Sequence, residues 1–295
     1  MIKNGRSHPV RFILAFYLLC FILRGIEYFF IRTDQSIIGE AFIHKLAGIA
    51  LLAGALWVLR YRWSDIGFRR DRALRGTLYG LALGVGVFAV AYGTELLILA
   101  MSGDAPTLHF YVTSYAIQGN RGMEDGLLFI AICIAGNIIN VIMEEGVFRG
   151  LFPRLMEDTY SFAKACLLAS ALFGLWHIAQ PVRNVLDGVQ SAMGGLLSGI
   201  LLVTTSTLLA VQYCMLYKIT GSIWAGMAAH FVNNTSVNLL HVVSAGGADQ
   251  LQTARIAIAQ SLSFVVVLVL FLLHMRREKQ GKDRLRKTDT VISTR

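Results

Sequence analysis

Residues 126–156 read GLLFIAICIAGNIINVIMEEGVFRGLFPRLM, a long apolar run that two glutamates and an arginine interrupt. About 20 predominantly apolar residues are enough to cross the hydrocarbon core of a bilayer as a helix. Ionisable side chains are costly in that core and, where they occur, usually face a protected cavity and carry function. The stretch therefore predicts a transmembrane helix with a buried polar site at Glu144, Glu145 and Arg149.

The composition of the whole chain agrees with this interpretation. Of its 295 residues, 55% are hydrophobic and 15% are charged, whereas about a quarter of the residues of a soluble domain are charged. The apolar runs are long and continuous, which argues against the short alternating segments of a transmembrane β-barrel. We therefore predict an all-α fold, a polytopic membrane bundle of about eight transmembrane helices.

Polar clusters divide the apolar sequence into eight runs of about 20 residues, each a predicted span. Together they predict a single integral-membrane domain over residues 1–274, in which residues 126–243 contain the polar motifs. The remaining residues, 275–295, form a basic tail that we expect to be cytoplasmic and disordered. The predicted spans are Val10–Ile31, Ile37–Leu59, Thr77–Met101, Gly126–Met156, Phe162–Gln180, Ala192–Tyr217, Ser222–Val243 and Arg255–His274.

The basic residues predict the orientation of the spans. If the spans alternate in direction, 20 of the 27 lysines and arginines fall on one side of the membrane, 4 on the other and 3 within spans. Basic residues collect in cytoplasmic loops, so both termini are expected to be cytoplasmic. Topology thus explains the net charge of +9. The basic residues lie beside spans without interleaved aromatics, so the bilayer is an expected partner and nucleic acid is not.

Two further motifs place polar side chains inside predicted spans. FGLWH contains Phe173 and His177, and HFVNN contains His230 and Asn234, on a polar seam that continues to His241. Each motif also has a structural explanation. A lone histidine is commonly a hydrogen-bonded packing residue, polar seams join helices in membranes, and the charges of the first motif are compatible with a cytoplasmic helix end.

Depth in the membrane favours a common site over these separate explanations. At a rise of about 1.5 Å per residue, Glu144, His177, His230 and Asn234 lie roughly 13–22 Å from the cytoplasmic ends of their predicted spans. All four therefore fall in the interior of the bilayer at overlapping depths.

These residue types predict a hydrolytic site. Glu144 and His177 are expected to share a water molecule, remove its proton and direct it at a carbonyl carbon, while His230 and Asn234 donate hydrogen bonds to the oxyanion. This reaction needs no cofactor. The alternative is a catalytic zinc ion bound by Glu144, His177 and His230. An HExxH motif is absent, and the 4 cysteines form no CxxC pair.

The three motifs resemble the signature of the CPBP family of intramembrane proteases (CAAX proteases and bacteriocin-processing proteins, also called Abi or Rce1-like). That signature is EExxxR, FxxxH and HxxxN on separate helices of an eight-helix bundle. The similarity is confined to about residues 126–243. The matching residues are Glu144, Glu145 and Arg149, then Phe173 and His177, then His230 and Asn234.

The resemblance implies a role for each matching residue. Glu144 with His177 would activate water, His230 with Asn234 would form the oxyanion hole, and Glu145 with Arg149 would orient Glu144. It also implies an endopeptidase of the glutamic type, often labelled a metalloprotease. Its substrate would be a membrane-associated protein or peptide that is lipidated, anchor-tagged or a peptide precursor.

One alternative comes from a different functional class. A proton- or ion-coupled membrane transporter would use the same buried glutamate and histidines as a relay. Transporters commonly contain inverted repeats and broken helices, and no internal repeat is found in this sequence. The compact size and short loops suggest a bacterial protein, so the expected location is the bacterial inner membrane.

Overall fold

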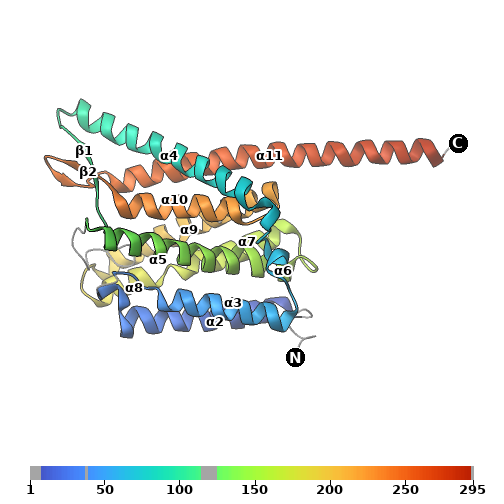
Figure 1. Ribbon diagram of the computed structural model, residues 1–295, viewed down its shortest axis with the longest axis horizontal. Helices are drawn as coiled ribbons and strands as arrows, with labels where there is room; N and C mark the ends of the chain where they lie inside the picture. The colour runs from blue at the N-terminus through green and yellow to red at the C-terminus, as the bar shows by residue number, and fades with distance from the viewer. Residues whose placement is uncertain (1–7, 37–38, 114–124, 294–295) are drawn as a thin grey trace.

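The computed structural model describes residues 8–36, 39–113 and 125–293, with side chains as far as residue 281. It is a bundle of α-helices with a small sheet at one end (Figure 1). The α-helices are α2 (Pro9–Ile26), α3 (Ile43–Leu59), α4 (Ala73–Met101), α5 (Leu127–Glu145), α6 (Phe152–Met156), α7 (Phe162–Trp176), α8 (Ala179–Leu186), α9 (Ala192–Thr220), α10 (Trp224–Leu239) and α11 (Gln252–Ser293).

Shorter elements connect or interrupt these helices. Two π-helical segments are η1 (Glu27–Ile31) and η5 (Gly146–Leu151). Three 3₁₀ segments are η2 (Thr33–Gln35), η3 (Trp63–Ile66) and η4 (Arg70–Arg72). The strands β1 (Thr107–Phe110), β2 (Leu240–Ser244) and β3 (Gly247–Ala248) form an antiparallel sheet in the order β1-β2-β3, with His109 opposite His241.

The bundle has the helices of an integral membrane protein, and the predicted all-α class is confirmed. Six helical stretches within the described residues are long and apolar enough to cross a bilayer. The helices α3 and α10 occupy two more of the predicted spans but are shorter, at 17 and 16 residues. The six long stretches are Pro9–Gln35, Arg70–Met101, Leu127–Met156, Phe162–Leu186, Ala192–Thr220 and Gln252–Gly281.

Two predicted spans end earlier in the structure than the sequence suggested. The span Phe162–Gln180 stops at Trp176, and α8 begins at Ala179. Pro181 explains the break, because proline cannot donate the hydrogen bond of a helix interior but is tolerated in a first turn. The span Ser222–Val243 stops at Leu239, and His241 therefore belongs to β2 and not to the polar seam of α10.

The C-terminal tail also differs from the expectation. Disorder was expected for residues 275–295, whereas α11 continues as a helix to Ser293 (Figure 1). The segment is rich in lysine and arginine, which have high intrinsic helix propensity and can extend the helix without tertiary contacts.

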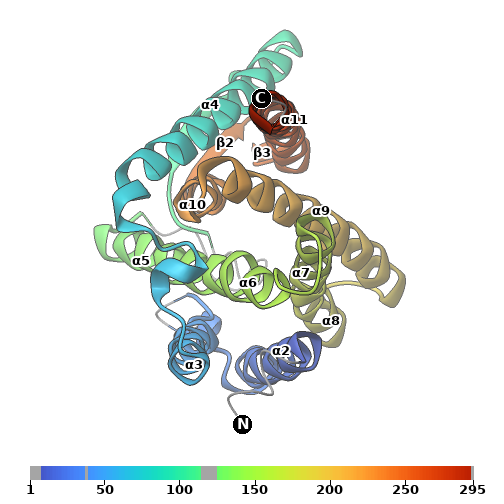
Figure 2. The ribbon, with the colours of Figure 1, turned by 90° about the vertical axis from the view of Figure 1, so that its right-hand side faces the viewer.

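Glycines on α4 bring α10 close to that helix. Gly76, Gly80 and Gly84 lie four residues apart and face α10, and a Cβ atom at Gly80 would be 2.2 Å from the carbonyl oxygen of Ala225. Small residues at such spacing let membrane helices approach backbone to backbone. Figure 2 shows α10 between α4 and α5 in the end-on view. The helix that carries His230 is therefore held against the helix that carries Glu144.

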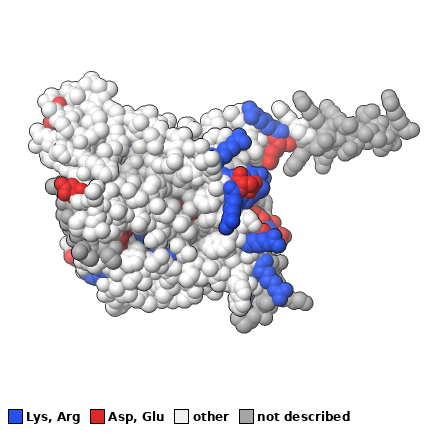
Figure 3. Space-filling model, in the orientation of Figure 1, with Lys and Arg blue, Asp and Glu red and all other residues white. Residues whose placement is uncertain are grey.

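Charge is distributed unevenly over the molecular surface. Lysine and arginine side chains gather at the end of the bundle where both termini lie (Figures 1 and 3). Exposed examples between α3 and α4, or in the first turn of α4, are Arg60, Arg62, Arg70 and Arg75. The opposite end carries the β-sheet and α8. This arrangement agrees with alternating spans.

Candidate active site

The predicted site residues come from three segments of the bundle. Glu144 and Glu145 end α5, and Arg149 lies in the π-helical η5 that follows. His177 caps the C-terminus of α7, while His230 and Asn234 lie one turn apart on α10. All residues of η5 are buried. π-Helical turns inside α-helices are frequent at functional sites, and this one follows the two glutamates directly.

Glu144 is buried and held by two hydrogen bonds. The indole Nε1 of Trp176 donates to its Oε1 at 3.0 Å, and Asn140 Nδ2 donates to its Oε2 at 3.3 Å. Asn140 lies one turn earlier on α5, so Glu144 does have a partner in its own helix, which the sequence did not reveal. Each donor fixes one carboxylate oxygen, and the side chain is 3% exposed.

Glu145 forms the centre of a second group of contacts. Its Oε2 lies 3.2 Å from Arg149 Nε, which is the ion pair expected from the i, i+4 spacing. Its Oε1 lies 2.8 Å from His230 Nδ1. The resemblance implied that Glu145 orients Glu144, whereas these contacts connect Glu145 to His230 and Arg149. Pairing of this kind reduces the cost of burying both charges.

His230 lies between the two glutamates. Its Nδ1 contacts Glu145, and its Nε2 faces Glu144 Oε2 at 3.7 Å, which is longer than a hydrogen bond. The Tyr213 ring, from α9, stacks on the imidazole with ring centroids 5.3 Å apart. Because Nδ1 donates to a carboxylate, the Nε2 edge of the ring is directed at Glu144.

His177 has a fixed orientation through its own helix. Its Nδ1 lies 2.9 Å from the Phe173 carbonyl oxygen, which can only accept, so this nitrogen carries hydrogen. In the neutral ring, Nε2 is then unprotonated and can receive a proton. The described contacts include no hydrogen bond between His177 and Glu144. The histidine also lies at the end of α7, where the sequence predicted the interior of a span.

The Phe173 ring connects the parts of the site. Its centroid is 4.8 Å from that of His177, 6.1 Å from that of His230 and 3.9 Å from the Arg149 guanidinium carbon. The guanidinium also lies 5.2 Å from the Tyr213 ring. Aromatic faces attract such a cation, most strongly where water is excluded.

Asn234 is the site residue least connected to the others. It is half-buried and accepts a hydrogen bond from Asn233 Nδ2 at 3.1 Å. Asn233 Oδ1 in turn accepts from Gln260 on α11 at 3.2 Å. Asn234 thus lies one turn beyond His230 without a direct contact to the glutamates among the interactions that the structure describes.

The ligand set of the zinc alternative does not converge. Within the described ranges, no group of three or more His, Cys, Asp and Glu side chains is arranged to hold a metal ion. The residues as placed do not fit a three-ligand zinc site.

Three residues of this cluster were missed by reasoning from the sequence. Asn140 precedes Glu144 by one helical turn but received no role, and Trp176 adjoins His177 in the FGLWH motif and also received none. Tyr213 lies on α9, in a span without any polar motif. Only packing between helices reveals that Trp176 and Tyr213 contact the charged groups.

Residues 126–236 match the model of the Rce1-like family, described as type II CAAX prenyl endopeptidase Rce1-like. The matched segment runs from α5 into α10 and contains all six predicted site residues. No curated protein matches the chain. The resemblance drawn from the three motifs is therefore confirmed over this segment.

Proposed function

We propose that this protein is an intramembrane glutamic-type endopeptidase that hydrolyses a peptide bond in a membrane-associated substrate. The observation that carries the proposal is the buried cluster at the junction of α5, α7 and α10. There His230 lies between Glu144 and Glu145, at 3.7 Å from the first and 2.8 Å from the second, and its ring and that of His177 both pack against Phe173. Buried ionisable groups within a membrane domain are a strong indication of function.

In the proposed reaction, Glu144 and His177 hold and activate one water molecule. His177 Nε2 is available to take the proton, because Nδ1 donates to the Phe173 carbonyl. The oxygen of the water then attacks the carbonyl carbon of the substrate, and the carbonyl oxygen becomes an oxyanion. The same proton passes to the departing amine as the C–N bond breaks, so the groups that act as base act afterwards as acid.

The oxyanion would be stabilised by His230 and Asn234. The Nε2 edge of His230 is the free edge of its ring, since Nδ1 donates to Glu145, and Nε2 donates to the oxyanion when the ring carries both protons. Asn234 supplies an amide donor one turn further along α10. Donors fixed in a site without water stabilise a developing charge at little cost of reorganisation. In this proposal Glu145 and Arg149 act on His230 and keep its ring in place.

The proposal is tested by a cleavage assay in proteoliposomes with a library of membrane-anchored peptides. His177→Asn is expected to lower kcat by about 10²- to 10⁴-fold, the usual effect of losing a general base. The matched control is His109→Asn, because His109 is exposed on β1 and its described side-chain hydrogen bond is to Thr107. Activity of His177→Asn equal to that of the control would refute the proposed role of His177.

The metal question has its own test. We expect activity to survive a strong chelator and the purified protein to lack stoichiometric zinc. Elemental analysis that finds one zinc ion per chain, together with loss of activity on chelation and its return with zinc, would replace this mechanism by the metalloenzyme alternative.

A further inference from the structure

The connector between α3 and α4, residues 60–72, forms an open cleft at the basic end of the bundle. Residues 62–65 and 68–71 line this cleft, which has a volume of about 750 Å³. Arg62 and Arg70 belong to its lining, and both side chains are exposed. Neither guanidinium forms an ion pair with any of the residues that the structure describes. The cleft therefore offers two cationic groups to a ligand.

The carboxylates of the same cleft are already engaged. Asp71 pairs with Arg69 through contacts of 2.8 and 3.3 Å. Asp65 accepts a hydrogen bond from the backbone nitrogen of Arg62 at 2.8 Å, which leaves the side chain of that arginine free to turn elsewhere. The unpaired charge in the cleft is therefore positive.

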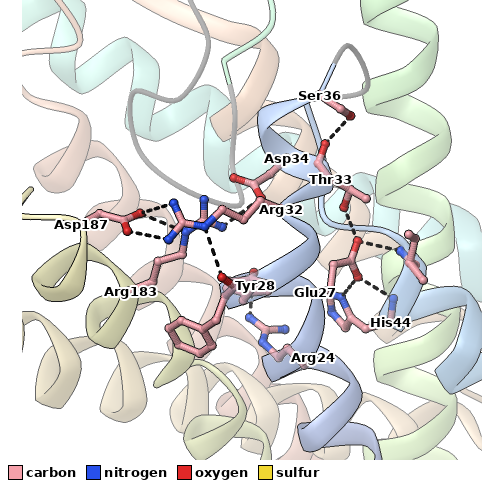
Figure 4. Close-up of polar contacts among 12 residues, drawn as sticks. Arg24, Glu27, Tyr28, Arg32, Thr33, Asp34, Ser36, His44, Arg183 and Asp187 are labelled. Carbon is pink, nitrogen blue, oxygen red and sulfur yellow. Dashed lines mark hydrogen bonds and ion pairs between the residues drawn. The ribbon is translucent and has the colours of Figure 1, made fainter.

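The arginines at the other end of the bundle have a different environment. Arg32 and Arg183 both contact the carboxylate of Asp187, at 2.8 and 3.2 Å (Figure 4). At that end the chain supplies the anion itself. Arg62 and Arg70 have no such partner among the described side chains, so an anion from outside the chain can take that place.

Neighbouring side chains place the cleft at the level of lipid headgroups. The connector joins two predicted spans at the end where they leave the bilayer. Trp63, in the cleft, is 41% exposed, and tryptophan is enriched at the membrane interface. Leu74 and Leu78, on the first turns of α4, are 75% and 55% exposed. Apolar surface suited to an acyl chain thus follows the arginines along the chain.

A phospholipid has the two chemical features that this surface fits. The planar fork of a guanidinium binds a phosphate through two parallel hydrogen bonds, and the exposed leucines of α4 match an acyl chain. A soluble phosphate would use only the first feature. The combination favours an anionic lipid of the adjacent leaflet as the ligand.

The inner side of the connector packs against the π-helical η5. Ile66 is fully buried, and a Cβ atom added to Gly150 would lie 2.8 Å from its carbonyl oxygen. A Cβ atom added to Gly146 would lie 3.4 Å from the Phe68 ring. The connector is therefore in close contact with the turn that directly follows Glu145.

The connector also holds the start of α10. The backbone nitrogen of Ile223 donates to the Gly67 carbonyl oxygen at 3.1 Å, and Trp224 Nε1 donates to the Arg69 carbonyl oxygen at 2.9 Å. His230 lies less than two turns further along the same helix. The backbone of the cleft thus contacts both elements that carry the buried glutamates and histidine.

We propose that this cleft binds the phosphate of an anionic phospholipid through Arg62 and Arg70, and that the bound lipid stabilises the arrangement of η5 and α10. The inference assigns a second site, and its binding part is independent of the proposed peptidase function. A ligand favours a conformation only if it binds that conformation better than the alternatives. The contacts of the connector with both elements supply this difference.

The binding test measures how phosphatidylglycerol is retained by the detergent-solubilised protein in native mass spectrometry. The double variant Arg62→Gln/Arg70→Gln is expected to bind this lipid about 10- to 30-fold more weakly than wild type, as for two arginines near an anionic surface. The matched control is Arg276→Gln/Arg277→Gln, which removes the same charge from exposed positions of α11. It is expected to bind as wild type does.

Two results of this measurement would overturn the proposal. Equal affinity of the two double variants would refute the site, because the lipid would then respond to overall charge alone. Displacement of the lipid by glycerol 3-phosphate at the concentrations at which phosphatidylglycerol itself competes would identify a soluble phosphate as the ligand and refute the lipid.

The coupling to the bundle is tested in nanodiscs of phosphatidylcholine and of an equal mixture of phosphatidylcholine and phosphatidylglycerol. The melting temperatures of wild type and of the control are expected to rise in the mixture, and that of Arg62→Gln/Arg70→Gln to stay the same. An equal rise in all three proteins, or no rise in wild type, would refute the stabilising role.

Peptide cleavage gives a separate readout of the same coupling. The kcat of wild type is expected to be about 5-fold or more higher in the mixture, and that of the cleft variant to be the same in both lipids. A wild-type kcat that does not respond to the lipid would refute the effect on the active site. If no peptide is cleaved in either lipid, the peptidase function falls, while lipid retention and melting temperature still decide this inference.

Discussion

Trp176, which the motifs left without a role, contacts Glu144 directly. Its Nε1 holds Glu144, its face covers Arg24, and its ring packs against Phe148 with centroids 5.8 Å apart. The sequence gives no sign of this, because a tryptophan in an apolar helix is equally expected in a packed core. The signature residues were predictable since ionisable groups in a membrane span are rare.

Removing the indole donor tests this positioning role. Trp176→Phe keeps an aromatic ring but loses the hydrogen bond to Glu144. We expect kcat to fall by about 10- to 100-fold, the range for a hydrogen bond to a charged group, with a smaller change in KM. Trp57→Phe, at a position 82% exposed, is the control. A normal kcat, or a fall in melting temperature that accounts for the lost activity, would contradict the role.

At the scale of elements, the structure departs from the sequence where helices end. Eight apolar runs were predictable because hydrophobicity and length decide whether a helix spans a bilayer. The end of α10 was not, since it depends on the pairing of β2 with β1. The assignment of His241 to a helical seam was wrong because His241 lies in β2, which pairs with β1. Strand pairing joins segments that are far apart in the sequence, so the residues of one strand alone do not indicate it.

The contact between α4 and α10 offers a test of element packing. In Gly80→Ala the new Cβ would lie 2.2 Å from the Ala225 carbonyl oxygen, so the helices must separate. We expect a loss of about 1–3 kcal/mol in stability and a lower kcat, because α10 carries His230. Gly86→Ala is the control on the same helix, with nothing within 4 Å of the added atom. Equal melting temperatures and rates for the two variants would contradict this packing account.

A second test at this scale concerns the end of the bundle that carries the sheet. Asp249 lies between β3 and α11 and contacts His241 Nδ1, and Arg255 donates to its Oδ1 at 2.8 Å. Burial tends to raise the pKa of the Asp249 carboxyl, but hydrogen bonds from His241 and Arg255 outweigh it. The pKa therefore falls below its usual 3.8. Arg255 also binds Glu95 of α4 at 2.6 Å, so this carboxylate helps join three elements.

The sign of the pH effect follows from that lowered pKa. A carboxyl with a lower pKa in the folded state stabilises the fold above its unfolded pKa, and the contribution is lost as the pH falls through the folded value. We expect the melting temperature of the wild type to drop as the pH is lowered below about 4. Asp249→Asn should start lower at neutral pH and lose less on acidification. Parallel melting curves for the two proteins across this range would contradict the assignment.

At the scale of the whole molecule, the division of basic residues agrees with the arrangement of the bundle. The lysines and arginines that the sequence assigned to one side gather at the end that carries both termini (Figure 3). We propose that this end faces the cytoplasm, as the excess of basic residues predicts.

Site-directed labelling of intact cells tests the orientation. Ser64 and Ser102 are exposed. Ser64 lies in η3, before α4 begins, and Ser102 follows the last residue of α4. The four native cysteines are buried. An impermeant maleimide is expected to label Ser102→Cys in intact cells, and Ser64→Cys only after permeabilisation. The reverse pattern would invert the topology and would place the basic end outside.

The most direct measurement of the central claim is peptide hydrolysis by Glu144→Gln beside Glu157→Gln, whose side chain is 45% exposed in a surface pair with Arg154. Both are assayed in proteoliposomes made with ¹⁸O-labelled water, with products identified by mass. We predict that wild type and Glu157→Gln release a fragment with one ¹⁸O atom in its new carboxylate, and that Glu144→Gln is slower by about 10²-fold or more. Cleavage by Glu144→Gln at the wild-type rate would contradict the account.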